Sequence, residues 1–301
     1  MTAFTRRAPL VKPAPPADDR RMLPLLELEA TGSDRYRAHA LARNMAGQIF
    51  GGQLLGSAMA AAMASGSALR PHMLQAFFLR GGRTGLPLEI EVERSKDGRR
   101  FAHRRVTLSQ PGKLLLTAEV SFHDDEAGLD EQAVTMPSVP APETLADVFE
   151  LSERYRDRLP AQTCARMRGR PSMEIRPCDP EVGFIRPTDE ARLQMWIRPA
   201  GPLPATPAAQ YAALAFMSDN WLVAPTTSRH MRSFFDGRYA PASLNHALWI
   251  HRAPDVSDWL LFETESPIVR GGRGLGRGLL YARSGELVAT ATQECLIQQQ
   301  D

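Results

Sequence analysis

The chain has 301 residues, a length that predicts about two domains at about 150 residues each. Hydrophobic residues make up 43% and charged residues 23%, which excludes a disordered or collagen-like chain. No apolar run reaches the roughly 18 residues that a membrane-spanning helix needs, and the net charge of +2 gives no reason to expect binding to nucleic acid or a membrane surface. The spacing of Cys164, Cys178 and Cys295 fits neither a disulfide framework nor a structural zinc site, so we expect a reducing compartment.

Residues 1–20 predict a disordered tail. They include four basic residues but no apolar stretch typical of a targeting signal, and four prolines prevent a helix. We therefore expect a cytoplasmic protein that begins to fold near residue 21.

The first half of the chain predicts one buried helix followed by antiparallel strands. Phe50–Ser65 is rich in Ala, Leu and Met and is apolar on nearly every side, with Gly51 and Gly52 at its start. Three runs with strand-like alternation follow, at Leu88–Arg94, Phe101–Ser109 and Leu114–His123.

The second half repeats this pattern after a predicted linker. Residues 126–170 contain acidic residues, prolines and a charged helical piece at Glu143–Arg158. Beyond them, residues 207–222 predict a second buried helix, with Thr206 as the N-cap and Pro207 in the first turn. The strands predicted around it are Met173–Arg176, Arg192–Arg198, His246–Arg252, Trp259–Ser266, Leu275–Arg283 and Glu286–Ile297.

An internal repeat supports this division. Gly98–Ala118 aligns with Gly271–Ala291 at a constant offset of 173, with seven identities in 21 positions, although any two hairpins with a glycine turn share some local similarity. An all-apolar helix must be wrapped, and a curved antiparallel sheet can wrap it. We predict an α+β double hotdog fold, with hotdogs at residues 21–125 and 171–299 whose sheets can join edge to edge.

Nine collinear segments between about Leu23 and Gln298 resemble the acyl-CoA thioesterase II family. They include FGGQLLGSAM at 50–59, AALAFMSDNWL at 212–222, ASLNHALWIHR at 242–252 and GELVATATQE at 285–294. The resemblance implies hydrolysis of fatty acyl-CoA to free acid and CoA without a metal or an organic cofactor. It also places the family's catalytic Asp, Thr or Ser, and Gln on Asp219, Ser243 and Gln293.

The residues themselves are consistent with these roles. Asp219 puts a carboxylate on an apolar helix, and Gln293 interrupts an apolar strand where the repeat has Val120. Taken singly, each residue has a structural alternative: an exposed helix end for Asp219, an outward-facing amide for Gln293 and a loop serine for Ser243. We expect Asp219 to take a proton from a water that Ser243 and Gln293 hold, while N–H groups near Gly51–Gly52 stabilise the oxyanion.

Other readings remain open at this point. An acyl-enzyme on Ser243 lacks a histidine base, because strand alternation places His246 on the opposite face. Family members commonly have Asp at Asn245, so a non-catalytic acyl-CoA-binding protein is the alternative function. Asp34 and His39 have the spacing of hotdog hydratases but lack the Asn-Pro between them.

The anionic CoA substrate calls for local positive charge. Arg270, Arg273 and Arg277 lie in a glycine-rich segment that could approach phosphates closely, and Arg80 and Arg83 lie in the matching first-half segment. The alternative is a basic surface turn, and the glycine pattern is no dinucleotide fingerprint because a strand follows it. We expect a homo-oligomer, a dimer or larger, because a double hotdog still exposes sheet and helix surface.

Overall fold

The computed structural model describes residues 21–44, 46–159, 161, 164, 172–182, 186, 188–230 and 239–299. The predicted tail lies outside these residues. The first half contains α1 (Leu23–Leu26), β1 (Glu29–Gly32), β2 (Arg35–Ala38), α2 (Gly51–Ala64), β3 (Arg70–Phe78), β4 (Leu88–Asp97), β5 (Phe101–Gln110) and β6 (Lys113–His123). The second half contains η1 (Pro142–Thr144), α3 (Val148–Arg154), β7 (Met173–Pro177), β8 (Arg192–Pro199), α5 (Pro207–Ser218), α6 (Pro225–Ser228), β9 (Tyr239–Ser243), β10 (Asn245–Ile250), β11 (Leu260–Arg270), β12 (Arg273–Ala282) and β13 (Leu287–Gln299).

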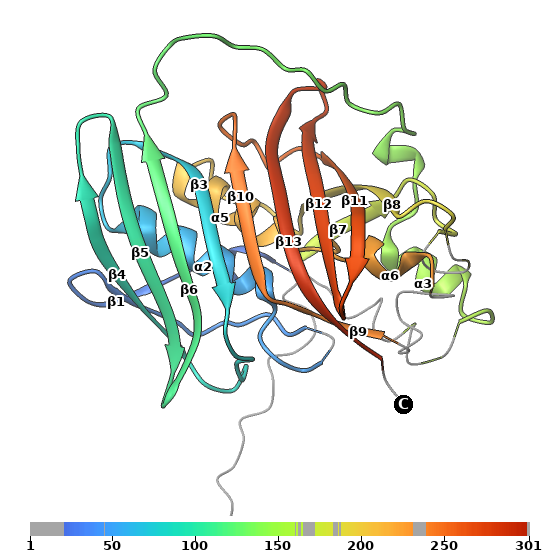
Figure 1. The fold of residues 1–301 in the computed structure, drawn as a ribbon, viewed down its shortest axis with the longest axis horizontal. Helices are drawn as coiled ribbons and strands as arrows, with labels where there is room; N and C mark the ends of the chain where they lie inside the picture. Colours follow the sequence, from blue (N-terminus) through green and yellow to red (C-terminus); the bar gives the residue numbers. More distant parts are fainter. Residues whose placement is uncertain are drawn as a thin grey trace, which may run out of the picture.

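One continuous antiparallel sheet runs through both halves (Figure 1). Its order is β1-β2-β4-β5-β6-β3-β10-β13-β12-β11-β8-β7, and β9 extends the edge of β13. The second half thus repeats the order of the first in reverse, and the halves meet where β3 pairs with β10, with Leu74 opposite Leu248. The predicted double hotdog and its edge-to-edge sheets are confirmed.

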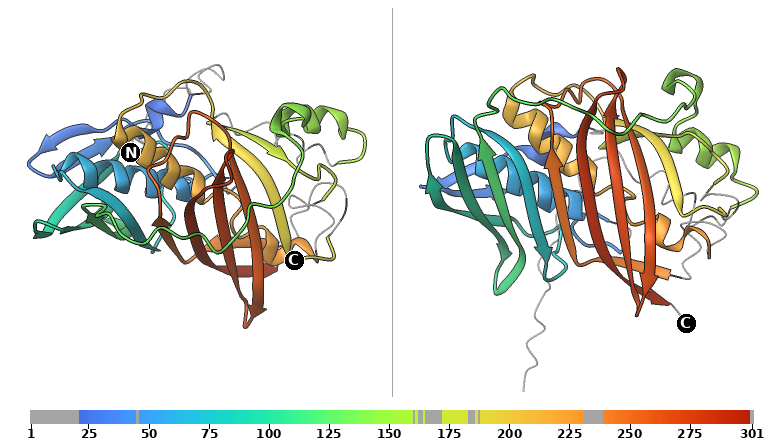
Figure 2. Two further views of the ribbon diagram at one scale, coloured as in Figure 1. Left: turned by 90° about the horizontal axis from the view of Figure 1, so that it is seen from above. Right: turned by 45° about the horizontal axis from the view of Figure 1, so that its top comes forward.

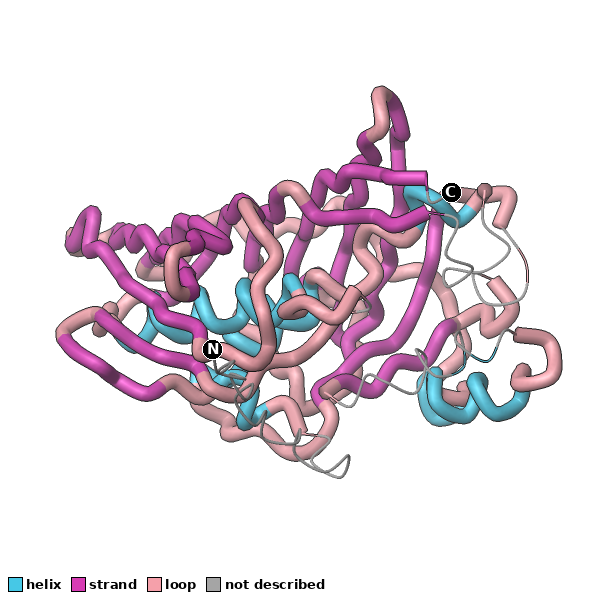
Figure 3. The backbone as a smooth tube through the Cα atoms, turned by 90° about the horizontal axis from the view of Figure 1, so that it is seen from below, coloured by secondary structure: helices cyan, strands magenta, loops and turns pink. Residues whose placement is uncertain are grey.

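The two long helices lie side by side on the concave side of this sheet (Figure 2, Figure 3). Glycines allow their close approach, since a Cβ on Gly52 would lie 2.2 Å from the carbonyl oxygen of Phe216. A Cβ on Gly56 would lie 3.1 Å from the carbonyl oxygen of Ala212, and the rings of Phe50 and Phe216 meet edge to face at 5.3 Å. Within the described part of the chain, no helix is long and apolar enough to cross a bilayer.

Two helix boundaries show how local chemistry sets the ends. Thr206 is the N-cap of α5 and Pro207 its first residue, as predicted. The prediction that this helix continues to residue 222 is wrong, because Asp219 caps it and Trp221 adopts a positive φ of 56°. β3 was not predicted at all, because its polar Arg, His and Gln residues obscure the alternation of RPHMLQAFF.

The first part of the segment predicted as a linker, residues 126–145, passes over the ends of the strands of the second half (Figure 1) and then packs against its outer face. Trp196 Nε1 donates to the carbonyl oxygen of Pro140 at 2.9 Å, and Arg176 Nη1 donates to that of Pro142 at 2.6 Å. Within the predicted helical piece, α3 occupies only seven residues and begins with a capping box formed by Asp147 and Glu150. We call residues 130–145 the strap.

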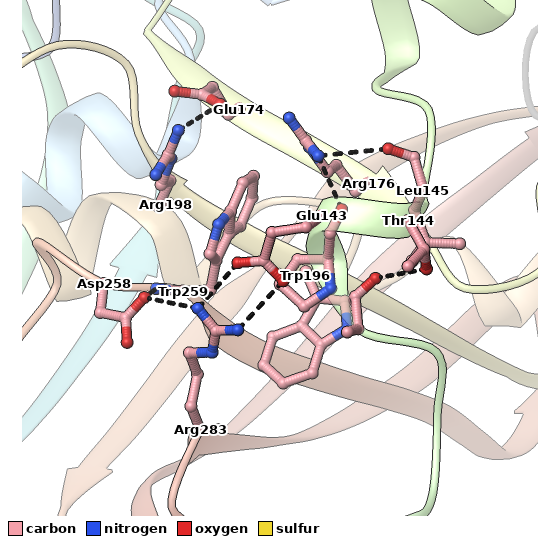
Figure 4. A network of polar contacts seen from close by, with 12 residues as sticks. Glu143, Thr144, Leu145, Glu174, Arg176, Trp196, Arg198, Asp258, Trp259 and Arg283 are labelled. Atoms are coloured by element: carbon pink, nitrogen blue, oxygen red, sulfur yellow. Dashed lines mark hydrogen bonds and ion pairs between the residues drawn. The ribbon is translucent and has the colours of Figure 1, made fainter.

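Aromatic and charged side chains hold the strap in place (Figure 4). The guanidinium groups of Arg176 and Arg198 lie 4.9 and 4.4 Å from the ring centre of Trp259. Arg283 adds a two-pronged ion pair with Glu143. Trp196 and Trp259 belong to a small apolar cluster separate from the main core, so this half of the sheet buries side chains on both faces.

Candidate active site

The carboxylate of Asp219 lies where the two central helices meet. Asp219 is the C-cap of α5 and is only 8% exposed, yet its Oδ1 is buried without a hydrogen-bond partner among the described residues. A Cβ on Gly51, the first residue of α2, would lie 2.7 Å from Asp219 Oδ2, so only glycine leaves room there. The N-terminal end of a helix dipole is a favourable place for a negative charge. The structure therefore brings two predicted site residues, Asp219 and Gly51, into contact.

A chain of buried polar side chains lies next to this carboxylate. Gln293 Nε2 donates to Ser243 Oγ at 2.6 Å, which joins the other two predicted residues. On its other side, Gln293 Oε1 lies 2.6 Å from His246 Nδ1, and His246 Nε2 lies 3.0 Å from Ser218 Oγ. Ser218 is the neighbour of Asp219 in sequence, so this series of hydrogen bonds returns to the end of α5. We call Ser218, His246, Gln293 and Ser243 the polar chain. The predicted Asp219, Ser243 and Gln293 are thus linked through two residues that were not predicted.

Burial controls the charge of His246. The side chain is 1% exposed, and burial lowers its pKa below the 6.5 of a free histidine, against smaller opposing effects of the Asp219 charge and the bond to Gln293. We therefore treat His246 as neutral near pH 7. A neutral imidazole has one N–H donor and one acceptor nitrogen.

The position of His246 corrects a prediction. Ser243 pairs with Cys295 and Ala247 pairs with Thr292, so four residue steps between β9 and β10 oppose three on β13. The extra residue is a β-bulge, which shifts the alternation of inward and outward side chains. Ser243 and His246 consequently reach the same side, and the prediction of opposite faces is wrong.

Asn245 has a structural role at this bulge. Its Oδ1 accepts a hydrogen bond of 3.1 Å from the backbone N–H of Glu294, while the N–H of Leu244 donates to the carbonyl oxygen of Glu294. An aspartate offers the same acceptor oxygen, so this bond survives the exchange of Asp for Asn.

The predicted arginines differ in their distance from this centre. Gly276 pairs with Gln293, so Arg273 and Arg277 lie on the opposite, outer face of the sheet, where they pair with Glu294 and Glu265. The structure does not bring these two arginines to the polar chain.

The alternating glycines beside these arginines serve packing. A Cβ on Gly276 would lie 2.3 Å from the carbonyl oxygen of Leu222, and one on Gly274 would lie 2.7 Å from the Thr226 side chain. Their small size therefore lets the segment after α5 lie directly on β12. Arg270 stands exposed at the turn that joins β11 to β12.

Arg80 and Arg83 lie nearer to the site. They are exposed on the loop that follows β3, and the N–H of Phe78, where β3 ends, donates to the carbonyl oxygen of Leu244 at 3.0 Å. Gly82 in the same loop accepts a hydrogen bond from Ile49, which directly precedes the start of α2. This loop therefore adjoins both Ser243 and the N-terminal end of α2.

Two alternative sites are not formed. Asp34 pairs with Arg94 and His39 pairs with Glu29, both on the β1–β2 edge, so the hydratase-like pair is not assembled. In the part of the chain that the structure describes, no group of three His, Cys, Asp or Glu side chains could hold a metal ion.

Comparisons with known proteins give the class. Residues 40–123 match the model of the acyl-CoA thioesterase N-terminal domain, and residues 135–297 match that of the C-terminal domain. The chain therefore belongs to the acyl-CoA thioesterase family, whose members are thioester hydrolases.

Individual relatives cover nearly the whole chain. It is 30% identical to acyl-CoA thioesterase 2 of Haemophilus influenzae, over 83% of this chain and 88% of that protein. It is also 30% identical to human acyl-coenzyme A thioesterase 8, over 94% of this chain and 91% of that protein. The crystal structure of an acyl-CoA thioesterase II from Mycobacterium marinum superposes with a TM-score of 0.74 at 29% identity, covering 93% of this chain and 98% of that one.

Proposed function

We propose that the chain hydrolyses fatty acyl-CoA through a water molecule that Asp219 activates together with Ser243 and Gln293. The observation that carries this proposal is the buried Asp219 carboxylate, whose Oδ1 has no hydrogen-bond partner among the described residues. A buried, unbonded carboxylate oxygen is costly to a fold and is available to accept a proton from a bound molecule.

The chemistry follows from the thioester. Thiols have pKa values near about 8.5, so CoA leaves readily as a thiolate and the reaction needs a directed nucleophile more than a strong acid. Asp219 takes one proton from the water, and the water oxygen bonds to the carbonyl carbon. The C–S bond then breaks as the carbonyl re-forms, and the proton held by Asp219 passes to the thiolate, which restores the carboxylate. The free N–H groups in the first turn of α2, at Gly51 and Gly52, would stabilise the oxyanion.

The same geometry suggests where CoA lies. The loop that carries Arg80 and Arg83 adjoins both Leu244 and the start of α2, and both arginines are exposed. Arginine recognises phosphate through forked hydrogen bonds. We therefore favour Arg80 and Arg83 over Arg273 and Arg277 as phosphate contacts.

A covalent acyl-enzyme on Ser243 is less well supported. The Gln293 amide lies between Ser243 and His246 and cannot take the serine proton as a base does. The thiol of Cys295 pairs across from Ser243, but burial raises its pKa and so disfavours the reactive thiolate. Direct attack by water avoids both difficulties.

A non-catalytic acyl-CoA-binding role is less well supported once the position of Asn245 is known. That alternative rested on Asn245, which forms a backbone hydrogen bond that an aspartate would also form. The cytoplasmic location and the homo-oligomer remain predictions.

Release of free CoA from a panel of acyl-CoAs of different chain lengths tests the proposal. The native chain should release CoA, and Asp219→Asn should lower kcat by about 1000-fold with little change in KM, as for loss of a general base. Asp34→Asn, which changes a carboxylate on the β1–β2 edge, is the matched control and should retain full activity. Near-normal turnover by Asp219→Asn, or an acyl group trapped on Ser243, would contradict the mechanism.

A further inference from the structure

The hydrogen bonds of the buried polar chain have a defined direction. The Oε1 atom of Gln293 can only accept, so the 2.6 Å contact requires the hydrogen on His246 Nδ1. A neutral His246 then has a bare Nε2, which can only accept. The Ser218 hydroxyl therefore gives its hydrogen to this nitrogen at 3.0 Å rather than to the carbonyl oxygen of Ala215, the other acceptor within reach at 2.9 Å. At the far end, Gln293 Nε2 donates to Ser243 Oγ. Every bond therefore runs in one direction, from Ser218 to Ser243.

This direction decides what Ser243 can do. Because the Ser243 oxygen already accepts from Gln293, its own hydrogen is free to donate to a bound water or substrate oxygen. A water that accepts from Ser243 can donate its own hydrogen to Asp219, which is the orientation that hydrolysis requires. If the Gln293 amide were turned over, Oε1 would take the Ser243 hydrogen and this orientation would be lost.

We propose that His246 is a positioning residue, which fixes the Gln293 amide by donating from Nδ1 to Oε1 and thereby keeps the Ser243 hydroxyl as a donor. This inference rests on the proposed function. The group acts through Gln293 and does not itself touch the reacting atoms.

The first half of the molecule argues against a purely structural role. Leu74 of β3 pairs with Val120, which is the repeat counterpart of Gln293, and both are fully buried. The fold therefore accepts an apolar side chain where the second half has His246. The buried histidine of the second half, with both nitrogens bonded, therefore has a reason beyond packing, and orienting the Gln293 amide supplies that reason.

Two substitutions separate positioning from packing. His246→Asn keeps an N–H donor where Nδ1 stands and should retain most of kcat. His246→Leu copies Leu74, removes the donor and should lower kcat about 100-fold with KM little changed, as for a misplaced catalytic group. His251→Leu is the matched control, because His251 bonds Thr290 on the same β13 but lies outside the polar chain, and its activity should be unchanged.

A double substitution gives the decisive readout. If His246 acts through Gln293, His246→Leu should cause no further loss of kcat in a Gln293→Ala background. An equal loss in both backgrounds, or full activity of His246→Leu alone, would overturn the proposal.

A spectroscopic measurement tests the inference without turnover. Nitrogen-15 NMR of histidine-labelled protein should show His246 as the Nδ1–H tautomer, and an Nε2–H tautomer would overturn the proposal. Absence of thioesterase activity in the native chain would instead refute the proposed function, while the tautomer would still report on the hydrogen-bond direction.

Discussion

The two central helices end in different ways, although both ends lie inside the same kind of half-barrel. At the end of α2, the C-cap Ser65 accepts a hydrogen bond from Arg104 at 2.7 Å, and the fully buried Arg104 also pairs with Asp97. At the end of α5, the C-cap Asp219 keeps a buried oxygen without a partner in the described chain. The end of α2 thus satisfies its polar groups, whereas the end of α5 leaves an acceptor unused.

The strands beside the helix ends differ in the same sense. In the first half, Val120 pairs with Arg104, whose side chain fills the space under the sheet. In the second half, Gln293 pairs with Gly276, which has no side chain, and the backbone at Leu222 fills the space instead. Native proteins satisfy nearly all buried polar groups, and exceptions concentrate at functional sites. The comparison therefore supports placing the proposed catalytic side chains in the second half, while the first half contributes the start of α2 and structural support.

Copying the first half into the second should have the largest effect. Gln293→Val, which introduces the residue found at position 120, should lower kcat by about 100- to 1000-fold, because it removes the donor to Ser243 and the acceptor for His246. Steady-state release of CoA measures this change. The reciprocal Val120→Gln should leave kcat of the folded protein unchanged, and an equal loss in both variants would refute the division of roles.

Replacing Arg104, whose side chain fills the space under the sheet of the first half, should lower stability and leave kcat intact. Arg104→Met keeps the apolar volume but removes the donor to the Ser65 hydroxyl oxygen and to the carbonyl oxygens of Lys96 and His103. The free energy of unfolding should fall by about 3 kcal/mol, because three acceptors in or beside the core lose their donor. Urea unfolding measures the loss, and kcat per folded molecule should match that of the native chain. A large drop in kcat would show that the Arg104 contacts also support catalysis.

Because the second half has His246 where the first has Leu74, the free energy of unfolding should depend on pH. Since burial lowers the pKa of His246, the unfolded chain takes up a proton below about pH 6.5 that the folded chain resists. The free energy of unfolding should therefore fall as the pH drops below 6.5, by up to about 1.4 kcal/mol per pH unit. His72 and His251 have lowered pKa values from the same cause and add to this slope.

Chemical unfolding of His246→Asn isolates the contribution of one histidine. Its unfolding free energy should depend less steeply on pH between about 7.5 and 5.5 than that of the native chain. Identical slopes would show that folding leaves the pKa of His246 unchanged.

The smallest effect is expected on the outer face, where only the second half has a strap. Trp196→Phe removes the donor to the Pro140 carbonyl oxygen and should lower the unfolding free energy by about 1 kcal/mol. Limited proteolysis should then cut residues 130–145 faster. Trp249→Phe, at a 41% exposed tryptophan of β10, should change neither measurement.

The fold followed from the sequence wherever apolar patterns were continuous. The two all-apolar helices and the meanders after them were predicted within a few residues, because a buried helix has no polar face to hide the pattern. The repeat at an offset of 173 by itself indicates the double hotdog. β3 escaped prediction because its outer residues are mixed in character.

The site was only partly predictable. The resemblance supplied Asp219, Ser243 and Gln293, and these are linked in the structure through Ser218 and His246. Strand alternation alone placed His246 wrongly, because a one-residue bulge leaves no clear mark in a single sequence.

The role of Arg270, Arg273 and Arg277 in CoA binding stays a prediction. The sequence did not show which face of the sheet Arg273 and Arg277 occupy, because that depends on what packs against the neighbouring glycines.

The seam between β3 and β10 has a consequence for any attempt to divide the molecule. β10 carries His246 and hydrogen-bonds the first half along its length, while Gly51 of the first half touches Asp219 of the second. A second half expressed alone would expose an unpaired strand edge beneath its own polar chain and would lack the helix end that faces the carboxylate. Each half has its own helix and strands in the same order along the chain, but neither contains all the residues of the proposed active site.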